Sequence, residues 1–149
     1  MKKLRIIARV LVVCQDKLLL VRNRGAKFWY PPGGGWEYED EVIKDCAARE
    51  VAEETGYIID IKNLLWVQEF REDDNVYFET FWRGELAEAN IQDVTGLETH
   101  VDLDAHGAVE EAKWFTEDDL VSLKVFPERA KTFMSSVEDA HVDPFIGSK

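Results

Sequence analysis

The sequence predicts a single domain of the α/β or α+β class, arranged as a sandwich of helices and strands. Two observations predict this class. Several short runs rich in Val, Ile and Leu are separated by turn residues, and one long amphipathic segment follows a glycine turn. A chain of 149 residues is long enough to bury one hydrophobic core, so we expect one domain over residues 1–149.

The N-terminal part of the chain predicts a hairpin. Leu4–Val13 is rich in Ile, Val and Leu and predicts a long strand, and Lys17–Arg22 predicts the strand that returns after a turn at Gln15–Asp16. A short apolar run, Phe28–Tyr30, ends at the pair Pro31–Pro32 because proline cannot donate a ladder hydrogen bond.

A helix is predicted from Asp40 to Thr55. Its apolar side chains recur at helical spacing and form one arc, made of Ala47, Ala48, Val51 and Ala52. Glutamates occupy a different arc, and Gly56 suits the left-handed conformation that commonly ends a helix. We therefore expect one face of this helix to pack against a sheet and another face to hold charge.

The second half of the chain predicts further strands and two helices. The expected elements are strands over Tyr57–Phe70, with a break near Lys62–Asn63, over Val76–Glu85 and over Glu111–Phe115, then a helix over Glu117–Leu123 with Thr116 as its N-cap and a helix from Pro127 to about Asp139. Ala87–Gly107 is polar with few periodic cues, and it predicts a long loop of the kind that carries specificity.

Composition narrows the range of partners. The formal net charge of −12 disfavours a nucleic-acid groove, which needs a basic surface, and suits a protein that binds Mg²⁺ or Mn²⁺ on carboxylates. No run approaches the ~20 apolar residues of a membrane span, so we expect no membrane partner and a cytoplasmic location. The spacing of Cys14 and Cys46 supports neither a disulfide framework nor a zinc site, and we expect both to be reduced and buried.

Three glutamates of the predicted helix form the strongest chemical signal. Glu50, Glu53 and Glu54 stand at positions i, i+3 and i+4, so they neighbour one another on the helix surface and repel without a cation. Mg²⁺ is bound in proteins by a few carboxylates together with substrate phosphates. Arg49 can orient a carboxylate with two hydrogen bonds, and the glycine turn lets backbone approach a phosphate closely.

The stretch from Gly35 to Tyr57 resembles the Nudix box, G-x5-E-x7-R-E-U-x-E-E-x-G-U, where U is a bulky apolar residue. The matching residues are Gly35, Glu41, Arg49, Glu50, Val51, Glu53, Glu54 and Gly56, with Tyr57 at the final U position. Tyr57 is aromatic where an aliphatic residue is usual, a variation for which Ile58 can compensate. The segment before the helix also departs from the family pattern, so Glu39, Asp40 and Glu41 compete for the acidic role at the helix entrance.

The resemblance implies a fold and an activity. The implied fold is a Nudix-like α/β/α sandwich with a mixed sheet, in which the box helix lies on one side and the C-terminal helix on the other. The implied activity is Mg²⁺- or Mn²⁺-dependent hydrolysis of the pyrophosphate linkage of a nucleoside diphosphate derivative. The resemblance makes Glu50, Glu53 and Glu54 the metal ligands, with Glu53 as first choice for the general base, and Glu50 and Arg49 complete the catalytic set. An extra ligand or base is sought at Glu41, Glu110 and Glu111.

Substrate identity is less defined by the sequence. Gly34, Gly35, Arg22 and Arg24 are expected to meet phosphates, and a base can stack on Trp29, Tyr30, Tyr77 or Trp82. The box lacks the neighbouring signatures that mark ADP-ribose, dinucleoside polyphosphate or coenzyme A specificity in relatives, which favours a nucleoside triphosphate. The alternatives are an ADP-ribose or nucleotide-sugar pyrophosphatase, a non-catalytic nucleotide-binding module and, against the acidic charge, an enzyme of RNA 5′ ends. Homodimer formation is left open.

Overall fold

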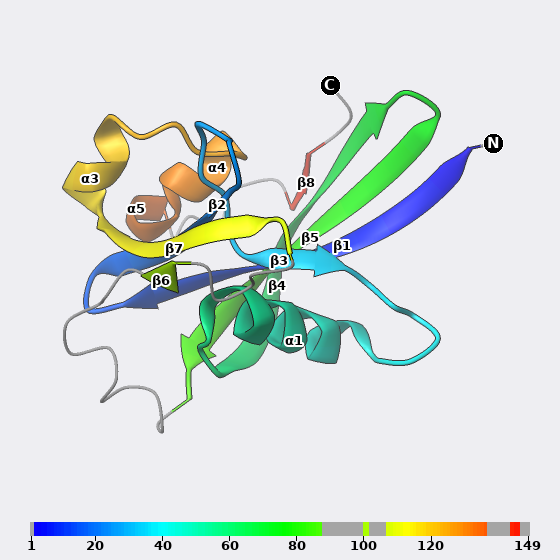
Figure 1. The fold of residues 1–149 in the computed structure, drawn as a ribbon, viewed down its shortest axis with the longest axis horizontal. Coiled ribbons are helices and arrows are strands. Elements are labelled where there is room, and N and C mark those ends of the chain that lie inside the picture. Colours follow the sequence, from blue (N-terminus) through cyan, green and yellow to red (C-terminus); the bar gives the residue numbers. More distant parts are fainter. Residues whose placement is uncertain (1, 88–99, 102–106, 137–143, 147–149) are drawn as a thin grey trace.

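The computed structural model describes residues 2–87, 100–101, 107–136 and 144–146. Its strands are β1 (Lys3–Cys14), β2 (Lys17–Asn23), β3 (Gly33–Gly35), β4 (Ile59–Glu72), β5 (Asn75–Leu86), β6 (His100–Val101), β7 (Val109–Thr116) and β8 (Phe145–Ile146). Its helices are α1 (Ile43–Thr55), α3 (Glu117–Val121), α4 (Glu128–Lys131) and α5 (Phe133–Ser136). Figure 1 shows α1 on one side of the strands and α3, α4 and α5 on the other.

The sheet is mixed, as the sequence resemblance implies. The strand order is β6-β7-β2-β1-β5-β4-β8, and β3 pairs with β1 beside this path. β1 and β2 form the predicted antiparallel hairpin, whereas β1 and β5 run parallel from Lys3–Asn75 to Val12–Gly84. β8 pairs in parallel with the outer side of β4 at Val67 and Gln68. The predicted α/β/α sandwich is therefore confirmed.

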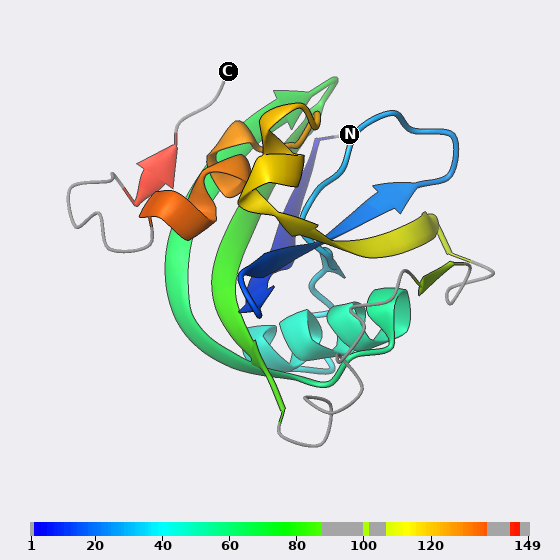
Figure 2. The same cartoon turned by 90° about the vertical axis from the view of Figure 1, so that its left-hand side faces the viewer.

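Each face of the central strands carries its own hydrophobic core. Alternation along β1 sends Ala8, Val10 and Val12 toward α1, while Leu11 points toward the helices of the other layer. The turned view separates the two layers clearly, with α1 below the strands and the α3–α5 helices above them (Figure 2). The α1 core includes Val51 from the helix, and the opposite core includes Trp66, Phe81 and other residues.

The box helix begins later than predicted and ends where predicted. Residues 37–41 form a turn, in which the backbone N–H groups of Asp40 and Glu41 both donate to the Glu37 carbonyl, so α1 begins at Ile43 rather than Asp40. At the other end Gly56 has φ 79°, and its N–H donates to the carbonyl of Ala52. This is the left-handed helix end that glycine adopts without steric cost.

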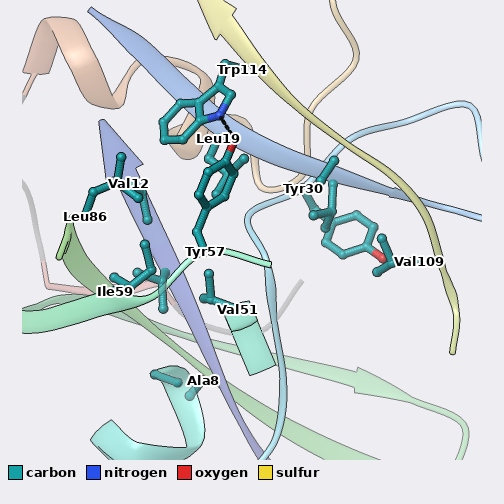
Figure 3. Packing of buried hydrophobic residues seen from close by; sticks show 14 of the residues in the cluster. Ala8, Val12, Leu19, Tyr30, Val51, Tyr57, Ile59, Leu86, Val109 and Trp114 are labelled. Carbon is teal, nitrogen blue, oxygen red and sulfur yellow. Dashed lines mark hydrogen bonds between the residues drawn. The ribbon is translucent and has the colours of Figure 1, made fainter. Parts of the chain in front are cut away.

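Tyr57 fills the α1 core itself, so the expected compensation by Ile58 is wrong. The Tyr57 side chain is 3% exposed, its ring meets the Trp114 ring edge-on at 5.5 Å, and its hydroxyl accepts a hydrogen bond from Trp114 Nε1 at 3.1 Å. Figure 3 shows this pair between Leu19 and Val51. Ile58 is 58% exposed. A buried aromatic residue is tolerated here because β7 supplies an indole N–H for its polar end.

Several other elements differ from the prediction. Up to Ser136, the helix predicted from Pro127 to about Asp139 is two short helices, α4 and α5, divided at Thr132, whose hydroxyl donates to the Arg129 carbonyl and competes with the helical hydrogen bonds. Residues 137–139 lie outside the described residues. β4 is continuous but its register shifts between Ile61 and Trp66, close to the predicted break. Cys46 is buried as expected, whereas Cys14 is half-buried.

Part of the predicted long loop lies outside the described residues. Between Ala87 and Gly107 the structure describes β6, which pairs with β7, and the rest of that segment is not among the described residues. Within the part of the chain that is described, no helix has the length and apolar character needed to cross a bilayer.

Candidate active site

The glycine turn is held directly against the box helix. β3 pairs with β1 through Gly33–Arg9, Gly34–Ala8 and Gly35–Ile7. A Cβ atom added at Gly34 would lie 2.4 Å from Cδ and 2.5 Å from Oε2 of Glu50. The absence of a side chain at Gly34 thus leaves the space that the Glu50 carboxylate occupies.

Arg49 connects three other predicted site residues, Glu41, Glu50 and Glu53. Its Nε and Nη2 donate to the two carboxylate oxygens of Glu41 at 2.8 and 2.9 Å. Its Nη1 donates to Glu50 at 3.0 Å and to Glu53 at 3.2 Å. The Glu41 contact is the two-pronged geometry that guanidinium groups favour with carboxylates.

Glu41 is the acidic residue that reaches the helix. Glu39 and Asp40 are exposed, whereas Glu41 contacts Arg49 and its backbone carbonyl accepts a hydrogen bond from Trp36 Nε1 at 2.9 Å. The hydrogen bonds from Arg49 lower the pKa of Glu41 from 4.5 to about 2. Glu41 is thereby kept ionised, and it fixes the guanidinium that orients Glu50 and Glu53.

Burial sets the protonation preference of Glu50. Loss of solvent around this side chain raises its pKa, and the nearby Glu53 carboxylate adds to that effect, while Arg49 opposes it. A carboxylate whose charge is disfavoured in this way gains most from a neighbouring cation. Arg49 supplies part of that charge, and a bound divalent ion would supply more.

Glu54 faces the glycine turn rather than Arg49. The backbone N–H of Gly33 donates to Oε2 of Glu54 at 3.1 Å. Tyr30 is close enough to be affected by the Glu54 charge. Burial is the main cause that raises the pKa of the Tyr30 phenol to about 12, and the negative charge of Glu54 adds to this effect. Glu54 is therefore the α1 carboxylate that connects the helix to the glycine turn and to the residues before it.

The donor set suits a hard divalent cation, although the side chains are not drawn together around one. Among the described residues no group of three His, Cys, Asp or Glu side chains is assembled as a metal site. Glu50 and Glu53 contact Arg49, and Glu54 contacts Gly33. Three carboxylates on one exposed helix arc, one of them partly desolvated, are nevertheless the oxygen ligands that Mg²⁺ and Mn²⁺ prefer.

A pocket opens on the face of β1 that carries Arg9, opposite the face that packs against α1. We call it the aromatic pocket. It has a volume of about 410 Å³ and is lined by Arg9, Asn23, Phe28, Tyr30, Gln68, Phe70, Glu79, Phe126 and Pro127. Phe28 and Phe126 meet edge-on at 5.1 Å, and Phe70 stacks on Tyr77 at 4.5 Å with 7° between the planes. The volume and the aromatic walls suit a planar ring.

The aromatic pocket and the carboxylates of α1 are linked by Arg9 and Tyr30. The Arg9 guanidinium lies 4.9 Å from the centre of the Tyr30 ring, donates from Nη1 to the Pro31 carbonyl at 3.2 Å and forms an ion pair with Glu79. Arg9 is also the register partner of Gly33, whose N–H binds Glu54. Arg9 and Tyr30 thus connect the pocket to the residues that lead into the glycine turn, and through Gly33 to Glu54.

Sequence reasoning missed Arg9, Gln68 and Glu79. They lie in strands whose apolar pattern predicts core positions. Only the register between the strands brings the three side chains to one face of the sheet. The sequence does contain one indication of their role. A charged or amide side chain at an apolar position of an alternating strand is a candidate functional residue.

The cations and extra carboxylates predicted from the sequence lie beside this site and are engaged with one another. Arg22 pairs with Glu110 at 3.2 Å and with Glu111 at 3.5 Å. Both glutamates lie within β7 rather than in the loop before it, because that strand begins at Val109. Arg24 donates from Nε to the Gly107 carbonyl at 3.2 Å.

Of the four aromatic residues predicted to stack on a base, Tyr30 lines the aromatic pocket. Trp29 is buried in the core on the α3–α5 side, and Trp82 packs against the α1 core. Tyr77 supports the pocket indirectly, because it stacks on Phe70.

A second, larger cavity of about 690 Å³ lies elsewhere, beside Leu11, Arg83 and Phe133. Its lining includes four carboxylates, those of Asp16, Glu85, Glu117 and Asp118, and none of the α1 glutamates. Arg83, the cation of this lining, is paired with Glu85, and the four carboxylates outnumber it, so this cavity suits a nucleotide poorly.

Known proteins resemble this chain in sequence pattern and in fold. A family model described as NUDIX domain matches residues 3–136. No curated protein matches the sequence. A solved UDP-X diphosphatase is 18% identical with a TM-score of 0.67, over 95% of this chain and 66% of that chain, so this chain spans just under two thirds of its length.

Two further solved structures cover nearly their whole length. An ADP-ribose pyrophosphatase from Streptococcus suis is 17% identical with a TM-score of 0.60, over 97% of this chain and 98% of that one. A MutT NUDIX hydrolase from Burkholderia pseudomallei is 21% identical with a TM-score of 0.64, over 90% and 98%. At these identities the likeness shows a shared fold, and the substrates differ between the proteins named.

Proposed function

The chain belongs to the Nudix family and is a pyrophosphohydrolase, and we propose that its substrate is a nucleoside diphosphate derivative, with a nucleoside triphosphate favoured. One observation carries this proposal: the aromatic pocket adjoins the glycine turn and Glu54 through Arg9 and Tyr30. A ring bound in the pocket places its phosphate chain toward the carboxylates of α1. This is the arrangement that a nucleotide needs.

The proposed metal ligands are Glu50, Glu53 and Glu54, and the proposed ion is Mg²⁺ or Mn²⁺. When held there, such an ion would supply charge that neutralises phosphoryl oxygens and would lower the pKa of an attacking water. Glu50 fits the ligand role best, since burial has already made its charge costly and a cation offsets that cost.

The remaining residues position the reacting groups. Arg49 holds Glu50 and Glu53 in place and is itself anchored by Glu41. Glu53 is the most exposed of the Arg49 partners, with 52% of its side chain accessible, so it can accept a proton from water and is the proposed general base. The backbone of Gly34 and Gly35 is free of side chains and can approach a phosphate.

The acidic surface and small pocket favour a small nucleotide over nucleic acid. The net charge of −12 disfavours a polyanion as substrate, and the pocket holds about 410 Å³. We propose a cytoplasmic enzyme on the same sequence grounds.

A substrate panel tests the proposal. Nucleoside triphosphates, ADP-ribose and a UDP-sugar are each incubated with Mg²⁺, with Mn²⁺ and with EDTA in ¹⁸O-water, and products are identified by mass spectrometry. We expect a nucleoside monophosphate as one product, ¹⁸O in a single product, and no reaction in EDTA. Faster cleavage of ADP-ribose or the UDP-sugar would reassign the substrate. Binding without any product would indicate a nucleotide-binding module instead.

A further inference from the structure

Glu79 presents a carboxylate oxygen to the aromatic pocket. Its Oε2 accepts from Nε of Arg9, and within the described residues no partner is recorded for Oε1. The Glu79 side chain is 12% exposed, and it lines the pocket. A ligand in the pocket can therefore donate a hydrogen bond to this oxygen in place of water.

Gln68 stands beside this oxygen. It is the register partner of Glu79 on β4, so the two side chains project from the same face as direct neighbours. Across the pocket, Asn23 accepts from the Tyr30 hydroxyl through Oδ1, which leaves its Nδ2 as a donor. Among the described residues neither the Gln68 amide nor Asn23 Nδ2 has a recorded side-chain partner. The pocket therefore combines aromatic walls with a few polar groups that no protein contact satisfies.

Arg9 fixes the orientation of Glu79. The guanidinium is held at three points, by Glu79, by the Pro31 carbonyl and by the Tyr30 ring, and only 19% of its side chain is exposed. A carboxylate fixed in this way acts only as an acceptor. It attracts N–H groups on a ligand and repels carbonyl oxygens.

We propose that Glu79 is a specificity-determining residue, which selects nucleobases that carry an exocyclic amino group over those that carry a carbonyl or a hydrogen in its place. The inference rests on the proposed function. Cytosine offers an amino donor where uracil offers a carbonyl acceptor, and guanine offers an amino donor that hypoxanthine lacks. Stacking on Phe28, Phe70 and Phe126 holds the ring but does not distinguish among these bases, since every base has an aromatic face.

The test compares matched substrate pairs. We measure kcat/KM for CTP against UTP and for GTP against ITP, with the wild-type enzyme and with Glu79→Gln. In at least one pair we expect the wild type to prefer the amino-bearing member by about tenfold or more. The variant amide is nearly isosteric and keeps an oxygen for Arg9, but it can rotate to donate or accept. The preference should therefore fall toward equality.

The ratio within a pair does not depend on the fraction of enzyme that is folded, so partial unfolding of the variant cannot imitate this result. Asp60→Asn, which neutralises an exposed carboxylate at the opposite end of β4 from Gln68 and Phe70, should leave the ratio unchanged. Equal use of both members by the wild type, or a preference that survives Glu79→Gln, overturns the assignment.

Binding of CMP, UMP, GMP and IMP by calorimetry separates this inference from the proposed function. Tighter binding of CMP than UMP or of GMP than IMP, lost in Glu79→Gln, supports the role of Glu79 even if no triphosphate is hydrolysed. Turnover of triphosphates with no such difference in binding or in kcat/KM would support the proposed function and contradict the inference.

Discussion

Gly34 is the glycine of the turn whose missing side chain leaves room for the Glu50 carboxylate. A Cβ atom there would lie within 2.7 Å of all three terminal atoms of the Glu50 carboxyl group. In Gly34→Ala we expect the carboxylate to move, with a loss of about a hundredfold in kcat/KM. The free energy of unfolding should change much less, because the displaced atoms are the end of a flexible side chain. Steady-state kinetics and chemical denaturation measure the two effects.

Gly25 offers a matched control for this substitution. It has φ +74°, and a Cβ atom there would meet nothing within 4 Å. Gly25→Ala should therefore cost about 1 kcal/mol of stability through backbone strain and leave kcat/KM unchanged. Loss of activity in both variants in proportion to their stability would contradict the special role of the space at Gly34.

Glu53→Gln tests the assignment of the general base. The amide keeps an oxygen for the hydrogen bond from Arg49 but cannot accept a proton, so we expect kcat to fall by about 10²- to 10⁴-fold. The circular dichroism spectrum and the unfolding temperature without metal should stay close to wild type. Asp60→Asn, at an exposed position of β4, controls for the loss of one negative charge. Near-wild-type turnover with Mg²⁺ would show that the proton acceptor lies elsewhere.

At the residue scale, the sequence predicts local relationships well and distant ones poorly. Helical spacing was sufficient to group Glu50, Glu53 and Glu54, and Gly56 was recognisable from its conformational preference. Arg9 and Glu79 are 70 positions apart, and their pairing depends on the parallel register of β1 and β5. No local pattern specifies that register, so the pocket floor could not be predicted.

At the scale of elements, α3 depends on its first turn. Thr116 accepts from the Asp119 N–H at 3.1 Å, and the Thr116 N–H donates to the Asp119 carboxylate at 2.9 Å, which is the reciprocal capping box. The sequence predicted Thr116 as the N-cap correctly. These bonds satisfy donors that every helix start leaves open.

The Asp119 carboxylate should make this cap pH-dependent. The hydrogen bond from the Thr116 backbone lowers its pKa below the ordinary value of 3.8, so the folded protein binds its proton more weakly than the unfolded chain. The stabilisation is fully present above 3.8 and is lost as the pH falls through the lowered folded pKa. The difference in unfolding free energy between wild type and Asp119→Asn should accordingly shrink on acidification, as measured by urea denaturation at several pH values.

Asp118→Asn is the control for that measurement, because Asp118 is adjacent and lacks the bond to Thr116 in the described structure. The difference in unfolding free energy between wild type and Asp118→Asn should not show the same dependence on pH. A difference between wild type and Asp119→Asn that persists below the folded pKa would show that the charge of Asp119 is not the cause.

Element boundaries show where local patterns fail. The predicted helix from Pro127 is interrupted at Thr132, because a hydroxyl bond to a backbone carbonyl replaces the helical one. The start of α1 was misplaced by three residues, because Glu41 folds back toward Arg49 instead of joining the helix. In both cases a hydrogen bond outside the regular helix fixes the boundary, and periodicity does not report such bonds.

At the scale of the whole molecule, metal binding should raise stability. Glu50, Glu53 and Glu54 repel one another in the folded state, and an ion bound there stabilises that state alone. At 100 times the dissociation constant the gain is about 2.7 kcal/mol. For a domain of this size that corresponds to a rise of roughly 5 to 10 °C in unfolding temperature.

Differential scanning fluorimetry with Mg²⁺, with Mn²⁺ and with EDTA measures this shift. A variant with both Glu50→Gln and Glu53→Gln should lose it and, without metal, should be at least as stable as wild type. Glu117→Gln, in α3, is the control and should retain the shift. An equal response of all three proteins would place the ion outside the carboxylates of α1.

The periodicity of apolar residues could not predict the overall topology of the sheet. Strand runs predicted a sheet and a hairpin, but the parallel pairing of β1 with β5 joins segments with α1 and β4 between them in sequence. The mixed sheet was expected only because of the resemblance of one 23-residue stretch to a family. Pairings between distant strands are set by the whole core, which no single segment encodes.

The alternation of side chains along β1 has a consequence for how such proteins diverge. Ala8 and Val10 support the catalytic helix from one face of the strand, while Arg9 contributes to the aromatic pocket from the other. Gln68 and Glu79 share the face of Arg9, and neither belongs to the core that supports α1. Selection can therefore alter which base is accepted while the packing of the hydrolytic machinery is conserved. One strand separates the part of the protein that is free to vary from the part that is not.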